Sequence, residues 1–214
     1  RRQAYYPSPV DWRDEVLYFL LVDRFRDTQR RPLLDRTNIK SARPDPWRWD
    51  LWADSGANRW QGGTIDGIAS RLGSLKRLGV TTLWLSPVFK QRGHEDSYHG
   101  YGIQDFLEVD PRFGDRKSLV KLVARAHKEG IRIILDIIFN HSGCNWLYSS
   151  DTPGGAYTPW YTAGQYPFGS WRGDDGQPVD SIQDSEDGVW PSERCMPDRY
   201  TRAGSGSLGA GDIS

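Results

Sequence analysis

Cysteine is nearly missing from this sequence, and neither sign of charge is in excess. The two cysteines, Cys144 and Cys195, could pair or stay free, and two thiols among 214 residues leave the cellular compartment open. Lys plus Arg and Asp plus Glu both number 28, so the formal net charge is zero. Nucleic acids and anionic membrane surfaces favour proteins with a basic excess. The sequence therefore predicts neither of them as a partner and favours an uncharged one.

Long apolar runs are missing as well. The longest covers residues 16–22 and falls short of the roughly 20 residues that a membrane helix needs. Apolar residues make up 37% and charged residues 26%, which is ordinary for a folded domain and argues against disorder. A chain of 214 residues can also bury a substantial core.

Aromatic residues, in contrast, are abundant. Ten Trp and ten Tyr exceed what one core needs. Many of the tryptophans lie in segments rich in Gly, Pro and Asp, namely Trp47, Trp49, Trp52, Trp60, Trp146, Trp160, Trp171 and Trp190. A flat ring on a loop offers an apolar face to the C–H face of a sugar, so the pattern favours a carbohydrate ligand. The alternative is that these rings pack long loops onto the scaffold, and we expect this of at least half of them.

Three apolar runs predict buried strands, at residues 16–25, 80–87 and 131–139. The third belongs to the stretch IRIILDIIFNH, residues 131–141, whose apolar, largely β-branched residues suit a parallel strand buried on both faces. It ends in Asn140 and His141, and polar side chains at the carboxyl end of such a strand mark the active face of a barrel. The alternative is a core strand that ends in a polar turn.

Two helical patterns separate these strands. The first follows Thr64, a good N-cap, and stops at Gly79; the second follows Asp115 and stops at Gly130. Strands that alternate with helices imply a parallel sheet with right-handed crossovers. The loops after the strands are long, whereas single glycines follow the helices, and this asymmetry predicts a (β/α) barrel whose active face is built by the loops after the strands.

The second of these long loops, residues 88–111, is dense in groups that could bind a ligand. They are His94, Glu95, Asp96, Tyr98, His99, Tyr101, Asp105 and Asp110.

Five motifs in order, WQGGTIDGI, LGVTTLWLSPVF, YHGYGIQDF, DPRFGD and DIIFNH, resemble the first half of the α-amylase family of glycoside hydrolases. The resemblance implies a TIM-type (β/α)8 barrel in the α/β class, with a domain inserted after the third strand. Residues 1–141 are then expected to form the N-terminal part of the barrel, with its first three strands. Residues 142–214 are expected to form the inserted, loop-rich domain, in incomplete form.

The resemblance also implies roles for single residues. His141 matches the histidine that binds hydroxyls of the sugar at the cleavage point, and Tyr101 matches the ring that stacks on that sugar. His99 lies beside Tyr101 and is expected to contact substrate, or else to pack the loop. Asp136 is expected to orient its neighbours by hydrogen bonds.

A calcium ion is the implied cofactor. Asn140 matches a residue whose side-chain oxygen binds calcium between barrel and insert, and Asp198, in the stretch CMPD, is its candidate partner. The alternative for Asp198 is a turn residue after proline.

The implied reaction is hydrolysis of α-1,4-glucosidic bonds with retention, by a pair of carboxyl groups about 5–5.5 Å apart. The family places these groups after later strands than the three expected here, so no catalytic residue is assigned. The sequence YHGY resembles endo-acting amylases on starch-like glucans or maltooligosaccharides. The alternatives are a glucan transferase or sugar isomerase on the same barrel, and a non-catalytic glucan-binding protein.

We also expect the chain to be part of a longer protein. Three strands cannot close a barrel that needs eight, and the third strand would keep an open edge.

Overall fold

The computed structural model describes residues 5–28, 60–148, 168–200, 206–207 and 212–213. Several expectations fall outside these residues: Trp47, Trp49, Trp52 and Trp160, and most of the loop that follows the first predicted strand.

A three-stranded sheet confirms the predicted parallel pairing. It consists of β1 (Leu17–Leu20), β2 (Thr82–Leu85) and β5 (Arg132–Leu135), in the order β1-β2-β5. Leu20 lies opposite Leu85, which in turn lies opposite Leu135, so all three strands end at one edge. The side chains that follow the strands therefore meet there.

The strands are shorter than predicted. The chain leaves the sheet after Leu20 and forms the short helix α1 (Val22–Phe25), because the Val22 N–H is taken by the Ser86 hydroxyl at 3.1 Å. At the end of β5, the Asp136 N–H donates to the Leu85 carbonyl at 3.1 Å, and residues 137–139 continue without strand pairing.

The first predicted helix divides into α3 (Ile65–Ala69) and α4 (Leu72–Arg77). Thr64 caps α3 as predicted, since its hydroxyl accepts from the Gly67 N–H at 3.0 Å. The break follows at Ser70, whose hydroxyl donates to the Gly67 carbonyl at 2.6 Å, and at Arg71, whose φ of −115° and ψ of 3° are not helical. The spacing of apolar residues continues across the break and gives no sign of it.

The second predicted helix is α5 (Arg116–Lys128), and Asp115 and Ser118 form a reciprocal capping box at its start. Gly130 follows its end with a φ of +77°, a left-handed conformation that favours glycine.

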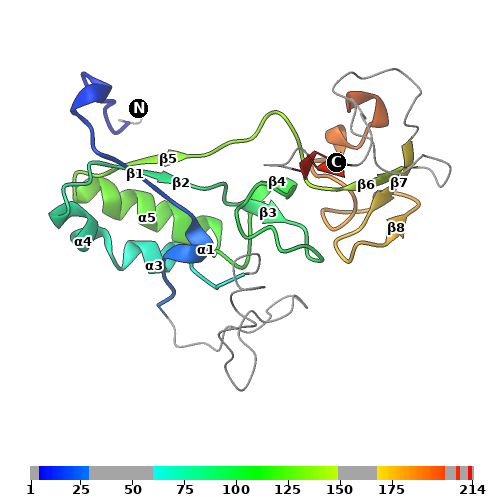
Figure 1. Ribbon diagram of the computed structural model, residues 1–214, viewed down its shortest axis with the longest axis horizontal. Coiled ribbons are helices and arrows are strands. Elements are labelled where there is room, and N and C mark those ends of the chain that lie inside the picture. The colour runs from blue at the N-terminus through cyan, green and yellow to red at the C-terminus, as the bar shows by residue number, and fades with distance from the viewer. Residues whose placement is uncertain (1–4, 29–59, 149–167, 201–205, 208–211, 214) are drawn as a thin grey trace.

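The core lies between the helices and one face of the sheet (Figure 1). Fully buried side chains come from both sides of this contact: Ile65, Ile68, Leu83, Leu85, Leu122 and Ile131. On the opposite face, Phe19 is 46% exposed and Trp84 40%. The expectation that β5 is buried on both faces is not met by the described residues: Ile133 and Ile134, on opposite faces, are only partly buried, and Leu135 at the end of the strand is 38% exposed although its neighbour Leu85 is fully buried.

The second long loop contains an antiparallel hairpin that the sequence reading missed. It pairs β3 (Phe89–Gln91) with β4 (Ile103–Val109), with shifts of register. The Gln91 side chain closes it, because its Nε2 donates to the Gly100 carbonyl at 2.9 Å and its Oε1 accepts from the Gly102 N–H at 2.7 Å.

A second antiparallel sheet follows residue 142. It contains β6 (Trp146–Tyr148), β7 (Phe168–Arg172) and β8 (Pro178–Val179), and the short turns η3 (Ser192–Arg194) and η4 (Pro197–Arg199) come after it. Three smaller elements are η1 (Trp12–Asp14), β9 (Gly206–Ser207) and β10 (Asp212–Ile213).

The hairpin lies between the two sheets (Figure 1) and is bonded to the segment after residue 142. The Trp190 N–H donates to the Gln104 carbonyl at 2.8 Å, and the Phe106 N–H donates to the Trp190 carbonyl at 3.0 Å. The domain boundary at residues 141–142 stays a prediction.

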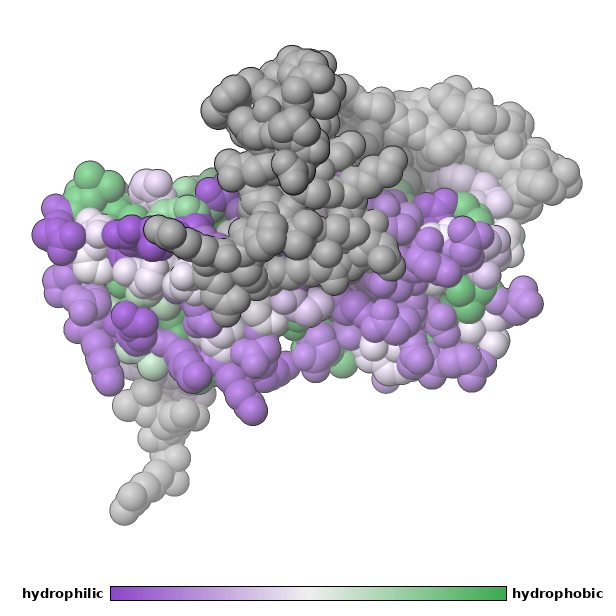
Figure 2. All heavy atoms as spheres, turned by 90° about the horizontal axis from the view of Figure 1, so that it is seen from below, coloured by the Kyte–Doolittle hydropathy of each residue, from purple (hydrophilic) through white to green (hydrophobic). Residues whose placement is uncertain are grey.

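The view from below in Figure 2 shows mainly hydrophilic side chains, with apolar ones in small separate groups. None of the helices in the described part of the chain has the length and apolar character of a membrane span.

The core predicts the effect of a matched pair of substitutions on α5. Leu122 is fully buried, whereas Val120 on the same helix is 62% exposed. Leu122→Ala should lower the free energy of unfolding by about 2–5 kcal/mol, because it removes buried methyl groups and leaves a cavity. Val120→Ala should change it by less than about 0.5 kcal/mol. Urea unfolding measures both, and equal effects would contradict the described core.

Candidate functional site at the carboxyl edge of the sheet

An acidic side chain follows β1 and another follows β5 at the carboxyl edge of the sheet. Asp23 after β1 is 2% exposed, and its carboxylate accepts from the backbone N–H groups of Gln61, at 2.8 Å, and Gly62, at 2.9 Å. Burial raises the pKa of the Asp23 carboxyl, and these N–H donors oppose that shift only in part. Asp23 therefore holds the WQGG segment against the end of β1.

Tyr101 and Asp136 form the centre of the candidate site. Tyr101 lies in the loop of the β3–β4 hairpin, and its hydroxyl donates to the Asp136 carboxylate at 2.8 Å. Burial and this carboxylate raise the pKa of Tyr101 to about 12, so the phenol stays a hydrogen-bond donor at neutral pH. Asp136 thus orients a neighbour, as the sequence predicts.

His99 and His141 lie on either side of Tyr101. The His99 ring stacks on the Tyr101 ring, with centroids 5.6 Å apart and planes inclined by 27°. The Tyr101 N–H donates to His99 Nδ1 at 3.0 Å, which leaves the proton of a neutral His99 ring on Nε2. His141 Nε2 lies 3.1 Å from the Tyr101 carbonyl oxygen, so it acts as the donor there. The structure therefore brings the three predicted substrate-binding residues together, and their role stays a prediction.

Two further residues extend this aromatic cluster. The Tyr98 ring meets His99 edge to face at 5.2 Å, and the Arg24 guanidinium lies 3.9 Å above the Tyr98 centroid. The sequence placed Tyr98 among the loop groups that could bind a ligand, but it gave no role to Arg24.

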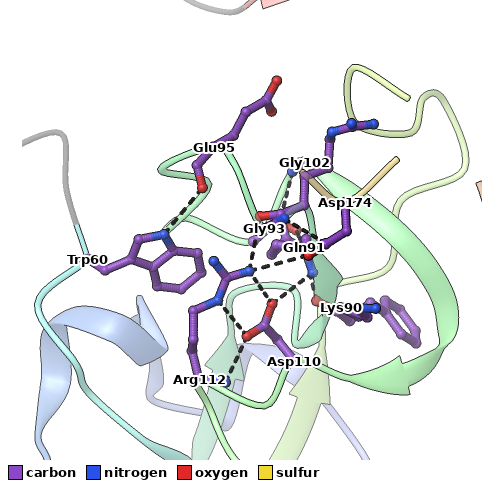
Figure 3. Close-up of polar contacts among 12 residues, drawn as sticks. Trp60, Lys90, Gln91, Gly93, Glu95, Gly102, Asp110, Arg112 and Asp174 are labelled. Carbon is purple, nitrogen blue, oxygen red and sulfur yellow. Dashed lines mark hydrogen bonds and ion pairs between the residues drawn. The ribbon is translucent and has the colours of Figure 1, made fainter. Parts of the chain in front are cut away.

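A buried ion pair supports the hairpin that carries Tyr101 (Figure 3). Arg112 donates from Nε to Asp110 Oδ1 at 2.9 Å and from Nη2 to Oδ2 at 2.8 Å. The Asp110 carboxylate also accepts from the Gln91 N–H at 2.8 Å. Asp110 is fully buried, so this carboxylate, one of the groups that the sequence offered to a ligand, is used inside the protein.

Trp60 connects this ion pair to the loop above it (Figure 3). The Arg112 guanidinium lies 3.9 Å over the Trp60 ring, and the Trp60 indole N–H reaches the Glu95 carbonyl at 3.4 Å. This tryptophan packs a loop onto the scaffold, as the alternative reading of the loop aromatics expects.

A pocket of about 200 Å³ adjoins His141. Its walls come from β4, from the segment after β5 and from the η3–η4 region: Phe106, Phe139, Asn140, His141, Ser142, Glu193, Arg194, Arg199 and Tyr200. Asp198 is exposed and precedes Arg199, but it is not among these residues. The predicted pairing of Asn140 with Asp198 on one calcium ion stays a prediction.

The described walls of this pocket do not fit a calcium ion. Calcium takes 6–8 oxygen ligands, usually with several carboxylates. The pocket offers one carboxylate, Glu193, and two guanidinium groups, Arg194 and Arg199. In the described part of the chain, no cluster of three or more His, Cys, Asp or Glu residues could hold a metal ion.

Parallel strands joined by helices, with aromatic and polar side chains gathered at their carboxyl edge, define a protein of the (β/α) class. The model of the alpha amylase catalytic domain matches residues 19–205, and the chain belongs to this family. Membership of the family implies a (β/α)8 barrel for the complete catalytic domain.

Curated relatives agree with this assignment. The chain is 35% identical to alpha-amylase 2 of Dictyoglomus thermophilum over 136 residues, which cover 64% of this chain and 20% of that protein. It is 36% identical to an alpha-amylase of Streptomyces lividans, over 70% of this chain and 15% of the relative. It is 31% identical to neopullulanase 2 of Thermoactinomyces vulgaris, over 78% of this chain and 27% of the relative. The chain thus spans between 15% and 27% of the length of these proteins.

Among solved structures, the alpha-amylase of Geobacillus thermoleovorans complexed with acarbose is similar to this chain. The sequence identity is 34% and the TM-score 0.49, over 63% of this chain and 25% of that one.

The buried ion pair predicts a second matched comparison. Asp110→Asn should lower the free energy of unfolding by about 3–5 kcal/mol, because it leaves the Arg112 charge buried without its counter-ion. The exposed pair of Lys76 and Glu129, 3.5 Å apart, provides the control, and Glu129→Gln should cost about 0–1 kcal/mol. Thermal and urea unfolding measure both variants. A loss in Asp110→Asn no larger than that in Glu129→Gln would show that the pair does not support the hairpin.

Proposed function

We propose that these residues are the first part of a (β/α)8 catalytic domain that hydrolyses α-1,4-glucosidic bonds within starch-like glucans, with retention. Three features support the proposal: the family, the parallel order β1-β2-β5, and the exposed apolar residues Phe19 and Trp84 on the face that the described helices leave open. Further strands of a barrel would cover that face and pair with the free edge of β5.

The observation that carries the proposed function is the meeting of Tyr101, His99 and His141 at the carboxyl edge of the sheet. An aromatic face can stack on the C–H face of a pyranose, while the imidazole of His141 can hydrogen-bond its hydroxyls. The cluster carries one carboxylate, Asp136, which is engaged by the Tyr101 hydroxyl, and one guanidinium, Arg24, which lies over the Tyr98 ring. Such a site suits an uncharged glucan.

We assign the groups that break the bond to later strands of the barrel. Retaining hydrolysis needs a nucleophilic carboxylate and a carboxylic acid about 5–5.5 Å apart across the scissile bond. Asp23 and Asp136 are already bonded to the WQGG backbone and to Tyr101, so these two carboxylates serve as positioning groups. No step of the proposal uses calcium, because the described walls of the pocket at Asn140 offer one carboxylate and two guanidinium groups.

The activity is tested by the products released from polysaccharides. The full-length protein should release reducing ends from starch and maltooligosaccharides, and cleavage inside the chain should lower the average length of amylose long before it is consumed. Pullulan, in which α-1,6 bonds interrupt the α-1,4 units, provides the comparison substrate. Transfer of glucosyl units to sugars without a net gain of reducing ends would point to a transferase instead, and no change in any substrate would point to a binding protein.

The role of Tyr101 is tested by two substitutions of different severity. Tyr101→Ala should lower kcat/KM on amylose on the order of a hundredfold, because it removes the ring that positions the sugar. Tyr101→Phe keeps the ring and loses only the hydrogen bond to Asp136, so a loss of about tenfold is expected. Tyr5, which is 87% exposed, provides the control Tyr5→Ala. Unchanged kcat/KM in Tyr101→Ala would remove this residue from the site.

A further inference from the structure

The pocket beside His141 has a charge that the proposed hydrolysis of a neutral glucan does not require. Its walls carry two arginines, Arg194 and Arg199, and one carboxylate, Glu193. With neutral His141 its net charge is +1. An uncharged sugar needs no such charge, so the pocket calls for a separate explanation.

The two guanidinium groups keep most of their hydrogen-bonding capacity. Arg194 lies 4.2 Å above the Phe106 ring, a contact that uses the face of the guanidinium and leaves its edge N–H groups available. Within the described ranges, no side-chain hydrogen bond or ion pair involves Arg199. Each arginine carries five N–H donors in a planar fork, which matches the oxygens of a phosphate or carboxylate group.

The segment that carries Arg199 is held by the aromatic residue that follows it. The Tyr200 ring packs 4.6 Å from the Trp146 ring and 6.1 Å from the Trp171 ring. Burial raises the pKa of Tyr200 to about 12, so its hydroxyl is an uncharged group in the pocket wall at neutral pH. These contacts fix the backbone beside Arg199 against the second sheet, so the site does not depend on a free loop.

The donors of the pocket come from two segments far apart in the sequence. Asn140 and His141 follow β5, whereas Arg194 and Arg199 belong to the η3–η4 region. The Asn140 amide adds an N–H₂ donor to the guanidinium groups. A group with several oxygens could accept from both segments at once.

We propose that this pocket binds an oxyanion of the phosphate class, held by Arg194, Arg199 and the Asn140 amide. The anion is either free phosphate or a phosphate ester carried on a glucan. The phosphate ester on a glucan rests on the proposed function, because His141 belongs both to this pocket and to the candidate sugar site. Glu193 opposes the anion and weakens its binding.

Binding of inorganic phosphate to the full-length protein tests the site without any measurement of activity. Calorimetry should detect binding, and Arg194→Ala and Arg199→Ala should each weaken it about tenfold, because each removes a charge-assisted hydrogen bond. Glu193→Gln should tighten it, because it removes the opposing charge. Arg125→Ala, at an exposed position on α5 outside the pocket, should leave it unchanged. Circular dichroism and melting temperature check that each variant is folded.

A phosphorylated maltooligosaccharide distinguishes the two sources of the anion. Tighter binding than that of both inorganic phosphate and the unphosphorylated sugar identifies the ester, whereas an affinity equal to that of phosphate identifies the free anion. Failure of the proposed hydrolysis would leave the phosphate measurement intact, so the two proposals can fail separately.

If the pocket bound calcium instead of phosphate, the same substitutions would change the affinity in the opposite direction. If calcium raised the melting temperature of the full-length protein, and if Glu193→Gln abolished that rise while Arg199→Ala increased it, the pocket would be a cation site and the proposal would be wrong. The absence of measurable binding at about 10 mM phosphate, a concentration that reveals even weak sites, would also overturn it.

Discussion

The buried ion pair of Asp110 and Arg112 is the interaction on which the described structure depends most. The Asp110 carboxylate accepts from the Arg112 side chain and from two backbone N–H groups. The Arg112 guanidinium also donates to the carbonyls of Gln91 and Arg92 at 3.2 Å. A carboxylate without exposure to water is stable only when its oxygens have such partners. The pair thereby joins the start of the hairpin to the segment before α5 and, through Trp60, to the segment before α3.

From this base the hairpin positions two different regions. Its loop carries Tyr101 to the Asp136 carboxylate at the edge of the parallel sheet. Its other side reaches the second sheet through Arg92, which is fully buried and donates to the Gly173 carbonyl at 2.8 Å. Burial lowers the pKa of Arg92 to about 10, which still leaves the guanidinium charged at neutral pH. A rigid connection between the sheets is what a site assembled from both of them requires.

The candidate sugar site and the arginine pocket meet at His141 but differ in chemistry. On one side, stacked rings and a carboxylate engaged by Tyr101 suit an uncharged pyranose. On the other side, two guanidinium groups suit an oxyanion and oppose the calcium ion that the family pattern predicts at Asn140. In the described part of the chain, packing such as that of the Tyr200 ring on the Trp146 ring holds the η3–η4 region against the second sheet.

The sequence by itself determined the features that are encoded within a few residues. Apolar runs located the three parallel strands, Thr64 and Asp115 marked the helix starts, and short motifs identified the family together with Tyr101, His99 and His141. Only the tertiary structure decided the hairpin, the buried Asp110 and the charge of the pocket. Tyr101 meets Asp136 across 35 positions, and Arg92 meets Gly173 across 81. Local periodicity carries no signal for contacts of that span, because their partners are chosen by packing and by the need to satisfy buried polar groups.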